Sequence, residues 1–428
     1  MRNLTHGSVL CVALLVSGSS IFASTGVLAQ SRDYHAQRIV LDDGNGHTAT
    51  VQYTGTTSTT FGIPSNAPNS GDVITSDGAG GTTWQSVGGG SVPAGTVITN
   101  LNSTPPTGYT LLAGPVTIST GATTWVTESS TGAGIRLGGG AIPFNGKIYI
   151  VGGTDNAGTY YNDVEVYDPA SNTWSTDATS GTYNPRSAVG VVVCNGLIYV
   201  MGGWPSSGTN SALNDAYNPV TKAWLSKAAM PVARGFSAIQ SDGTYVYAMS
   251  GQNDGGNLTS TDVYDPVNNN WNTTKTAAAT PTILSYPESA VLNGKFYLVG
   301  GSGSGSTQYL YSYDPVGNSW TSLSAVGLTD RNLPGVAAVS GKLYVFGGLT
   351  TQFNPPPPTI LEVATDEAYD PSSNTWGAAI SSGFTARTQP MGASLNGTIY
   401  AFGGYNGTAN KIMQVLTPGF SAYYFVKN

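Results

Sequence analysis

The sequence predicts an all-β repeat protein, built from units of roughly 50 residues of the kind that form propeller blades or solenoids. Three signals recur in a fixed order from Arg136 onward. They are a Tyr three residues before a Gly-Gly pair, a Tyr-Asp-Pro-like turn, and a Trp seven residues after the Tyr of that turn. The stretch Pro185–Trp224 contains all three signals in a single unit.

The first two predicted strands of each unit are joined by a tight hairpin. An apolar run such as Ala188–Val193 is long enough for a buried strand. An Asn-Gly turn follows it in four units, and Asp242-Gly243 or Ser340-Gly341 replaces it in two. The second strand then ends in a glycine pair, which allows a conformation that a Cβ would obstruct. The pairs are Gly152-Gly153, Gly202-Gly203, Gly300-Gly301, Gly347-Gly348 and Gly403-Gly404, with Ser250-Gly251 in the third unit.

A third predicted strand ends at the Tyr-Asp-Pro turn, and a fourth carries the tryptophan. Proline fixes φ in this turn, and Asp or Asn can bond its own backbone there. The Tyr and Trp supply large rigid surfaces for packing one unit on the next. The tryptophans are Trp174, Trp224, Trp271, Trp320 and Trp376, while Leu416 and Tyr423 occupy the Tyr and Trp places of the sixth unit.

This pattern resembles the kelch repeat. The resemblance implies a six-bladed β-propeller, with four-stranded blades around a central channel and one blade closed by the two ends of the repeat region. Two segments are alternative candidates for the strand that completes the last blade. Thr123–Ser129 places Trp125 one repeat length before Trp174, and Ala422–Val426 would complete the last blade from its own repeat.

The region before the repeats divides into a signal peptide and a polar segment. The apolar run Gly7–Val16 and the exit Val27-Leu28-Ala29 predict a secretory signal over residues 1–29, cleaved after Ala29. Residues 30–122 are rich in Gly, Ser and Thr, and parts of them resemble stalk segments of bacterial surface proteins and phage-tail fibres. We expect a stalk or attachment segment, with a disordered linker as the alternative, and the propeller over residues 123–428.

The charge and cysteine content of the chain indicate which classes of partner it binds and where in or outside the cell it acts. Only 9% of residues are charged, against a usual value of roughly 25%. The formal net charge of −7 argues against nucleic acid and anionic membrane surfaces. After signal cleavage Cys194 would be the single cysteine, so no internal disulfide is expected. We expect a secreted protein, extracellular, on the cell surface or periplasmic, with no membrane insertion and with assembly through residues 30–122 as an option.

Position within the repeat suggests one candidate site. An arginine stands 16 residues before each glycine pair in five of the six units, just ahead of the innermost strand. By strand parity, these arginines ring one mouth of the channel. Guanidinium groups suit carboxylate ligands, so the ring is a candidate anion site; the alternative is that each Arg bonds carbonyls or Asp side chains of neighbouring blades. The arginines are Arg136, Arg186, Arg234, Arg331 and Arg387, with Leu284 in the fourth unit.

The fourth and fifth units break the symmetry on the same face. Glu288 stands where the other units have Gly, Ala or Met, and it is a candidate proton carrier or sugar-hydroxyl acceptor, or else the partner of an adjacent Arg. Trp204 follows the second glycine pair and could stack on a sugar ring or cover an apolar edge of its blade. An insertion containing Pro355–Pro358 is either a rim or lid, or a surface loop.

The positions of the histidines limit the kinds of catalytic and metal site that the repeats can form. The three histidines, His6, His35 and His47, all precede the repeats. Copper chemistry like that of kelch-fold galactose oxidases and a Ser-His-Asp triad are therefore not expected, and neither a metal nor a cofactor is predicted. A binding module for a glycan or protein is favoured. An enzyme resembling kelch-fold sialic acid mutarotases and a structural fibre component are the alternatives.

Overall fold

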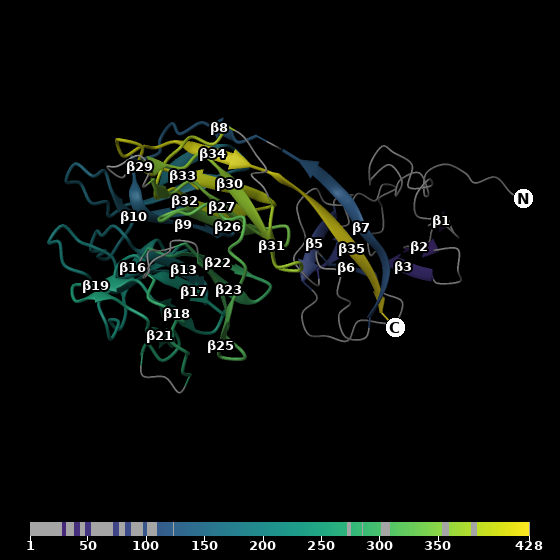
Figure 1. Ribbon diagram of the computed structural model, residues 1–428, viewed down its shortest axis with the longest axis horizontal. Helices are drawn as coiled ribbons and strands as arrows, with labels where there is room; N and C mark the ends of the chain where they lie inside the picture. Colours follow the sequence, from purple (N-terminus) through teal and green to yellow (C-terminus); the bar gives the residue numbers. More distant parts are fainter. Residues whose placement is uncertain are drawn as a thin grey trace, which may run out of the picture. The chain divides into compact units, whose positions relative to one another are not determined.

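The protein is described by a computed structural model that divides it into two units. It describes residue 122, residues 124–271, 275–284, 286–300, 309–352, 359–377 and 383–427, and seven N-terminal strands between residues 28 and 121. Thr123–Leu416 form one compact unit, and residues 1–122 form the other together with 417–428. Every regular element in the described ranges is a strand (Figure 1).

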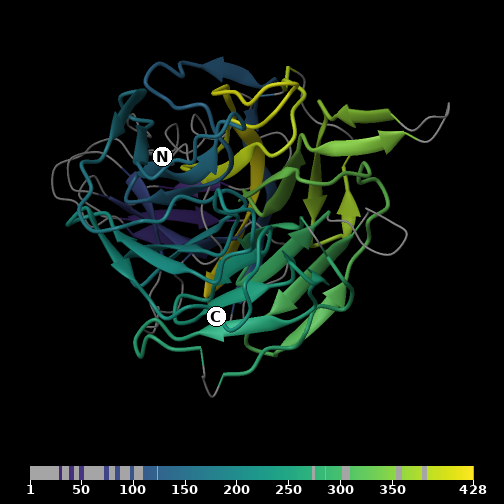
Figure 2. The same ribbon diagram turned by 90° about the vertical axis from the view of Figure 1, so that its left-hand side faces the viewer.

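The unit from Thr123 to Leu416 is a six-bladed β-propeller, as the repeats predict. The blades follow one another around a centre, from blue to yellow in Figure 2. The first two blades are β9 (Leu137–Phe144), β10 (Lys147–Thr154), β11 (Val164–Asp168) and β12 (Thr173–Thr176), then β13 (Gly190–Cys194), β14 (Leu197–Met201), β15 (Asn214–Asn218) and β16 (Ala223–Ser226). The third is β17 (Ala238–Ser241), β18 (Val246–Met249) and β21 (Thr261–Tyr264).

The remaining blades have four strands each. The fourth is β22 (Glu288–Leu292), β23 (Lys295–Val299), β24 (Leu310–Asp314) and β25 (Ser319–Ser322). The fifth is β26 (Gly335–Val339), β27 (Lys342–Phe346), β30 (Asp366–Asp370) and β31 (Thr375–Trp376). The sixth is β32 (Met391–Leu395), β33 (Thr398–Phe402), β34 (Met413–Leu416) and β8 (Val126–Glu128).

Two short hairpins extend the loops that follow the glycine pairs. In the third repeat, β19 (Gln252–Asn253) pairs with β20 (Gly256–Asn257). In the fifth, β28 (Leu349–Gln352) pairs with β29 (Thr359–Glu362). The predicted proline run Pro355–Pro358 falls between β28 and β29, outside the described residues.

The Asn-Gly hairpins adopt the predicted backbone. Asn195 and Gly196, for example, have φ of 48° and 73°. The left-handed conformation at both positions matches the twist of the flanking strands. The third repeat differs, because Gly243 (φ 89°) has a positive φ and Asp242 does not. Its strands instead pair Ser241 with Val246 across a longer loop.

The glycine pairs connect neighbouring blades. Gly202 and Gly203 have φ of 64° and 96°, and a Cβ on Gly202 would collide with the main-chain oxygen of Arg234 in the next repeat. The amide of Gly203 donates to that same Arg234 oxygen at 2.8 Å. The equivalent bond closes the ring between the last and first blades, from Gly404 to the oxygen of Arg136 at 2.9 Å. Close backbone approach therefore explains the glycine requirement.

The repeated tryptophans also join blades. Four of the five predicted indoles donate to a main-chain oxygen of the connector entering their own blade, as Trp271 does to Ala228 at 2.7 Å. Each packs on the tyrosine of its own turn, with ring centroids 4.9–5.3 Å apart. Trp224 is fully enclosed at 5% exposure, whereas Trp174, Trp271, Trp320 and Trp376 are partly buried.

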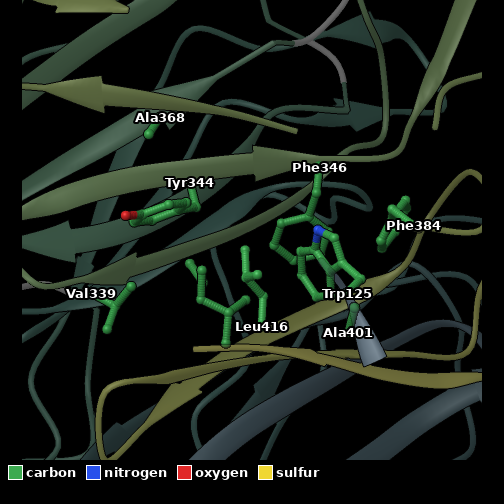
Figure 3. Close-up of a cluster of buried hydrophobic side chains, with 10 residues drawn as sticks. Trp125, Val339, Tyr344, Phe346, Ala368, Phe384, Ala401 and Leu416 are labelled. Carbon is green, nitrogen blue, oxygen red and sulfur yellow. The ribbon is translucent and has the colours of Figure 1, made fainter. Parts of the chain in front are cut away.

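The outer strand of the last blade comes from the segment that precedes the first repeat. β8 pairs with β34, matching Glu128 to Met413 and Val126 to Val415. Trp125, beside this strand, is 3% exposed and packs against Phe346 and Phe384, with Leu416 in the same cluster (Figure 3). Of the two predicted closing segments, Thr123–Ser129 therefore supplies the strand.

The other candidate closing segment belongs to the second unit. Ala422–Val426 lies in β35 (Pro418–Lys427), which pairs with β6 (Val97–Asn100) and β7 (Tyr109–Gly121). The expected propeller range of 123–428 thus ends earlier, at Leu416. The second unit also contains the sheet β1 (Leu28–Gln30), β2 (Arg38–Asp42) and β3 (Thr48–Gln52), and the pair β4 (Asp72–Ser76) and β5 (Thr82–Ser86).

Two N-terminal predictions are not tested by these strands. The signal peptide over residues 1–29 lies outside the described residues apart from Leu28 and Ala29 in β1. The stalk or attachment role of residues 30–122 also stays a prediction.

Candidate functional site

The five repeated arginines are buried inside their own blades. Their side chains are 0–1% exposed. Arg186 shows the arrangement: its guanidinium donates to Asp215 at 2.7 Å and to the main-chain oxygen of Gly202 at 2.7 Å. Arg136 likewise bonds Glu165 and Gly152, Arg234 bonds Asp262 and Ser250, and Arg331 bonds Glu367 and Gly347. Each of these arginines ties the innermost strand to the second and third strands of one blade.

The acidic partners occupy a repeat position that the sequence prediction overlooked. The partner stands two residues before the tyrosine of the Tyr-Asp-Pro turn, as Asp215 does before Tyr217. The fourth repeat replaces both members at once, with the fully buried Leu284 in place of Arg and Tyr311 in place of the acid. Comparing the six repeats by position would have revealed this pairing without a structure.

The sixth repeat keeps the arginine but has an amide as its partner. Arg387 donates to Oε1 of Gln414 at 2.5 Å, and Gln414 donates in turn to the oxygen of Gly383 at 2.8 Å. The guanidinium also lies over the Phe384 ring, 4.2 Å from its centroid. Burial without a facing carboxylate lowers the pKa of Arg387 to about 9.

This geometry corrects the picture of the arginines as a ring of ligand-binding groups. A buried guanidinium that already bonds carbonyl and carboxylate oxygens has little surface for an anion. The alternative prediction, that each arginine bonds carbonyl and carboxylate groups of the propeller itself, describes them better, with one change. The side chains bond within their own blade, while the main-chain oxygens accept hydrogen bonds from the preceding blade. The central channel and the residues around its opening face solvent instead.

The inner strands of all six blades surround a cavity of about 310 Å³. Most of its wall is formed by small or apolar residues such as Gly190, Ile239 and Met391. Among the described residues that line it, Glu288 is the one with a charged side chain, and none is Lys, Arg or His. When Glu288 is ionised, the cavity therefore carries a negative charge.

One residue from each blade stands at the mouth of this cavity, two positions after the arginine or Leu284. All six have a left-handed backbone, with φ between 50° and 64°. That conformation is sterically costly for side chains other than Gly, Asn or Asp. These residues, which we call the mouth ring, are Gly138, Ala188, Phe236, Tyr286, Leu333 and Gln389.

The mouth ring combines a constant backbone with varied side chains. Main-chain bonds link successive members, for example from Phe236 to the oxygen of Ala188 at 3.0 Å and from Gln389 to that of Leu333 at 2.9 Å. Strained conformations of this kind are held in place by surrounding structure and cluster at functional sites. The sequence could not indicate them, because Phe, Tyr, Leu and Gln have no preference for this conformation.

Aromatic rings gather on one side of the mouth. Phe236 and Tyr286 both line the cavity, and their ring centroids are 4.6 Å apart in an edge-to-face arrangement. Trp204 packs behind Phe236 with centroids 5.0 Å apart and is partly exposed. Its indole nitrogen donates to Asn210, which Asp254 holds through a 2.7 Å hydrogen bond. Trp204 therefore packs against the next blade and remains available to a large ligand at the rim.

Glu288 begins β22, two residues after Tyr286, and its side chain is exposed to the cavity. No ion pair to its carboxylate is present among the described residues, so it is not the Arg-paired acid of the alternative prediction. Desolvation by the inner strands around it raises the pKa of Glu288 to about 8. A shifted carboxyl in a concave site is a candidate for ligand binding or proton transfer.

No group of three or more His, Cys, Asp or Glu side chains is placed to hold a metal ion among the residues that the structure describes. Likewise, they contain no helix long and apolar enough to cross a bilayer.

Comparisons with known proteins agree with the propeller. The sequence profile of the Attractin/LZTR1 β-propeller matches residues 142–413. Human Kelch-like protein 23 is 27% identical over 292 residues, and zebrafish (Danio rerio) Kelch-like protein 15 is 30% identical over 175. N-acetylneuraminate epimerase of Haemophilus influenzae is 35% identical over 118 residues.

These matches are partial in both directions. They cover 66%, 36% and 27% of this chain, and 48%, 27% and 30% of the respective relatives. The chain therefore spans half or less of the length of each of these three relatives.

Proposed function

The chain belongs to the Attractin/LZTR1 β-propeller family and carries kelch repeats, and on this premise we propose that it is an interaction module that binds a partner through the mouth of its propeller. By the mouth face we mean the mouth ring together with the residues that follow the glycine pairs, such as Trp204 and Tyr405. Isolated bridges from Ser187 to Trp204 and from Thr388 to Tyr405 bring these two sets of residues together.

The observation that carries this proposal is the cluster of Trp204, Phe236 and Tyr286 beside the cavity. Tryptophan and tyrosine are enriched among the residues that dominate binding energy in protein interfaces. Main-chain hydrogen bonds hold the backbone of the mouth ring, so ordering Phe236 and Tyr286 when a partner binds should cost little conformational entropy. The opposite face carries isolated apolar residues instead, such as Val267 and Val316 in the Asp-Pro turns.

A protein partner is the form of this proposal that the kelch relationship supports most directly, since kelch propellers commonly mediate protein–protein contacts. A glycan is the alternative partner. Trp204 and Tyr286 could stack on sugar rings, and Gln389 offers amide hydrogen bonds at the same mouth.

A photo-crosslinking residue at position 286 tests which face binds. The matched control carries the same residue in place of Val316, which is 92% exposed in the same blade at the opposite end of the strands. We expect a discrete adduct from position 286, which the purified partner reproduces, and none from position 316. Equal capture from both positions, or capture from position 316 alone, would refute the proposal. A glycan array with the same two proteins tests the alternative.

We also propose that the protein acts outside the cytoplasm. The signal-like segment over residues 1–29 and the single later cysteine, Cys194, support this location. N-terminal sequencing of the protein isolated from its natural source tests it, with Gln30 expected at the N-terminus and Met1 contradicting it.

A sugar mutarotase is a second candidate function, favoured by the partial match to N-acetylneuraminate epimerase and by Glu288 in the channel. An acidic sugar would have to bind beside this carboxylate, with no arginine, lysine or histidine among the described lining residues. This charge arrangement favours binding over catalysis. NMR measurement of anomer exchange tests the candidate: Glu288→Gln must abolish the exchange if Glu288 carries the proton.

A further inference from the structure

We propose that the mouth cavity binds an alkylammonium group, with the cation held by the Glu288 carboxylate and the aromatic rings of Phe236 and Tyr286. This inference rests on the proposed function, because it names the chemistry recognised at the same mouth. Three features carry it: the charge of the lining, the position of the rings and the size of the cavity.

The charge of the lining selects for a cation. Glu288 projects into the cavity without an ion-pair partner among the described residues, and the five arginines that could have neutralised it face into their own blades. The inner strands around Glu288 partly desolvate its carboxylate, and a bound cation would offset that cost. An anionic ligand would add a second negative charge to this site.

The aromatic rings select for an organic cation over a hydrated metal ion. Phe236 and Tyr286 line the same cavity as Glu288, and their edge-to-face contact keeps the two ring planes 71° apart. Aromatic faces attract ammonium groups through the ring quadrupole. The alkyl part of such a ligand would contact apolar residues that line the cavity, such as Ile239, Val291 and Met391.

The cavity has the size of a small ligand or of one long side chain. Its volume of about 310 Å³ lies at the lower end of the range for small-molecule pockets, roughly 300–1,000 Å³. Two sources could supply the ammonium group: a lysine side chain inserted by a partner protein, or a free amine. Both have the same chemistry at the cavity.

Methionine-methyl NMR of the full chain tests the inference directly. Met391 lines the cavity, whereas Met201, Met249 and Met413 are fully buried elsewhere and serve as internal references. The probes are n-butylammonium, its neutral analogue n-butanol and its acidic counterpart butyrate. We expect the Met391 signal alone to move, saturably, with n-butylammonium, and with at least tenfold weaker binding of the other two.

A matched pair of variants assigns the binding to Glu288. Glu288→Gln should weaken n-butylammonium binding by about tenfold or more, while Glu128→Gln removes a carboxylate on β8 and should leave the binding unchanged. Equal binding of n-butanol, an unmoved Met391 signal, or full binding by Glu288→Gln would overturn the inference. If Glu288→Gln fails to fold, the comparison of n-butylammonium, n-butanol and butyrate on the unaltered protein still tests the inference.

The pH provides a third readout. Tyr286 is the other titratable residue that lines the cavity; the described lining residues of β9, β13, β17, β26 and β32 have none. Ammonium binding should therefore tighten as the pH rises towards and past about 8, where Glu288 ionises. Affinity that does not rise over this range would contradict the role of Glu288.

Peptides distinguish the two sources of the ammonium group. A peptide with one lysine should shift Met391 if the cavity accepts a side chain, and its Lys→Met counterpart should not. Binding of n-butylammonium without the lysine peptide would assign the cavity to free amines. Failure of every amine would overturn this inference alone, because the crosslinking at position 286 tests the binding face independently.

Discussion

Arg387 donates to Oε1 of Gln414 at 2.5 Å, in the position where Arg136, Arg186, Arg234 and Arg331 each face a carboxylate. At this pair of positions, the described residues thus place an arginine opposite a carboxylate in four repeats, an arginine opposite an amide in the sixth, and Leu284 with Tyr311 in the fourth. A protein with so few charged residues places a notable share of them inside its blades. These pairs tie together the strands of their own blades, and Glu288 is the one acidic residue among the described residues that line the channel.

Breaking one of these pairs should strongly destabilise the fold. Asp215→Ala leaves the fully buried Arg186 without its carboxylate. We expect a loss of about 3–5 kcal/mol in the free energy of unfolding, measured by urea denaturation. The variant Asp168→Ala removes the partner of Lys147, whose side chain is 46% exposed, and should lower the free energy of unfolding much less.

Replacing both partners should restore much of this loss. Burial raises the pKa of Asp215 although Arg186 opposes the rise, so the pair pays a large desolvation cost. The double variant Arg186→Leu/Asp215→Tyr copies the fourth repeat and removes that cost. It should be more stable than Asp215→Ala. If the double variant is less stable than Asp215→Ala, the ion pair stabilises the blade by more than the neutralisation of two buried charges.

The closing strand should be essential to the propeller. Trp125 is 3% exposed between Phe346 and Phe384, so Trp125→Ala should destabilise by about 3–5 kcal/mol. Thermal unfolding of this variant and of Trp174→Ala, which is only partly buried, gives the comparison. An equal or larger effect of Trp174→Ala would contradict the role assigned to Trp125.

Gly202 should tolerate alanine far less well than Gly196, although both have a left-handed backbone (φ 64° and 73°). A Cβ on Gly202 would strike the oxygen of Arg234, whereas Gly196 has open space around that position. Both changes incur the conformational cost of alanine at positive φ, which exceeds about 1 kcal/mol. The additional loss in Gly202→Ala, measured by urea denaturation, reports the contact between blades; equal losses would exclude it.

The stability difference between Glu288→Gln and the unaltered protein should depend on pH. The pKa of Glu288 rises from 4.5 to about 8 on folding, so between these values the folded state binds more protons than the unfolded state. Stability of the unaltered protein therefore falls as the pH rises through this window. Glu288→Gln lacks this contribution, and its melting temperature relative to the unaltered protein should increase up to about pH 8 and then level off. A constant difference would contradict the raised pKa.

Much of the scaffold follows from local signals in the sequence. Asn195-Gly196 determines a hairpin and the Gly202-Gly203 pair determines a close contact, because both depend on backbone conformations that few residues adopt. The closing strand was ambiguous, since pairing with β34 is set by contacts between distant segments. Trp125 and Ala422–Val426 were both suitable in sequence, and only the fold distinguishes them.

The site was less accessible to prediction than the scaffold. The repeat spacing predicts that Glu288 lies on an inner strand, but its exposure to the cavity depends on the inner strands of all six blades. Phe236 and Tyr286 gave no signal, because neither residue type favours the left-handed backbone that it adopts here. The arginines stood out in the sequence, and their burial became apparent only from the partners that the third strands provide.

The most direct test of the proposed interaction is the affinity of the purified partner for two variants of the fourth blade. Tyr286→Ala places at the mouth the residue that the second repeat already has there, Ala188, so the backbone should be retained. Val316→Ala alters the opposite end of the same blade. Calorimetry should show binding weakened by about tenfold or more in Tyr286→Ala and unchanged in Val316→Ala. The reverse result would place the binding surface on the Asp-Pro turns and contradict the account.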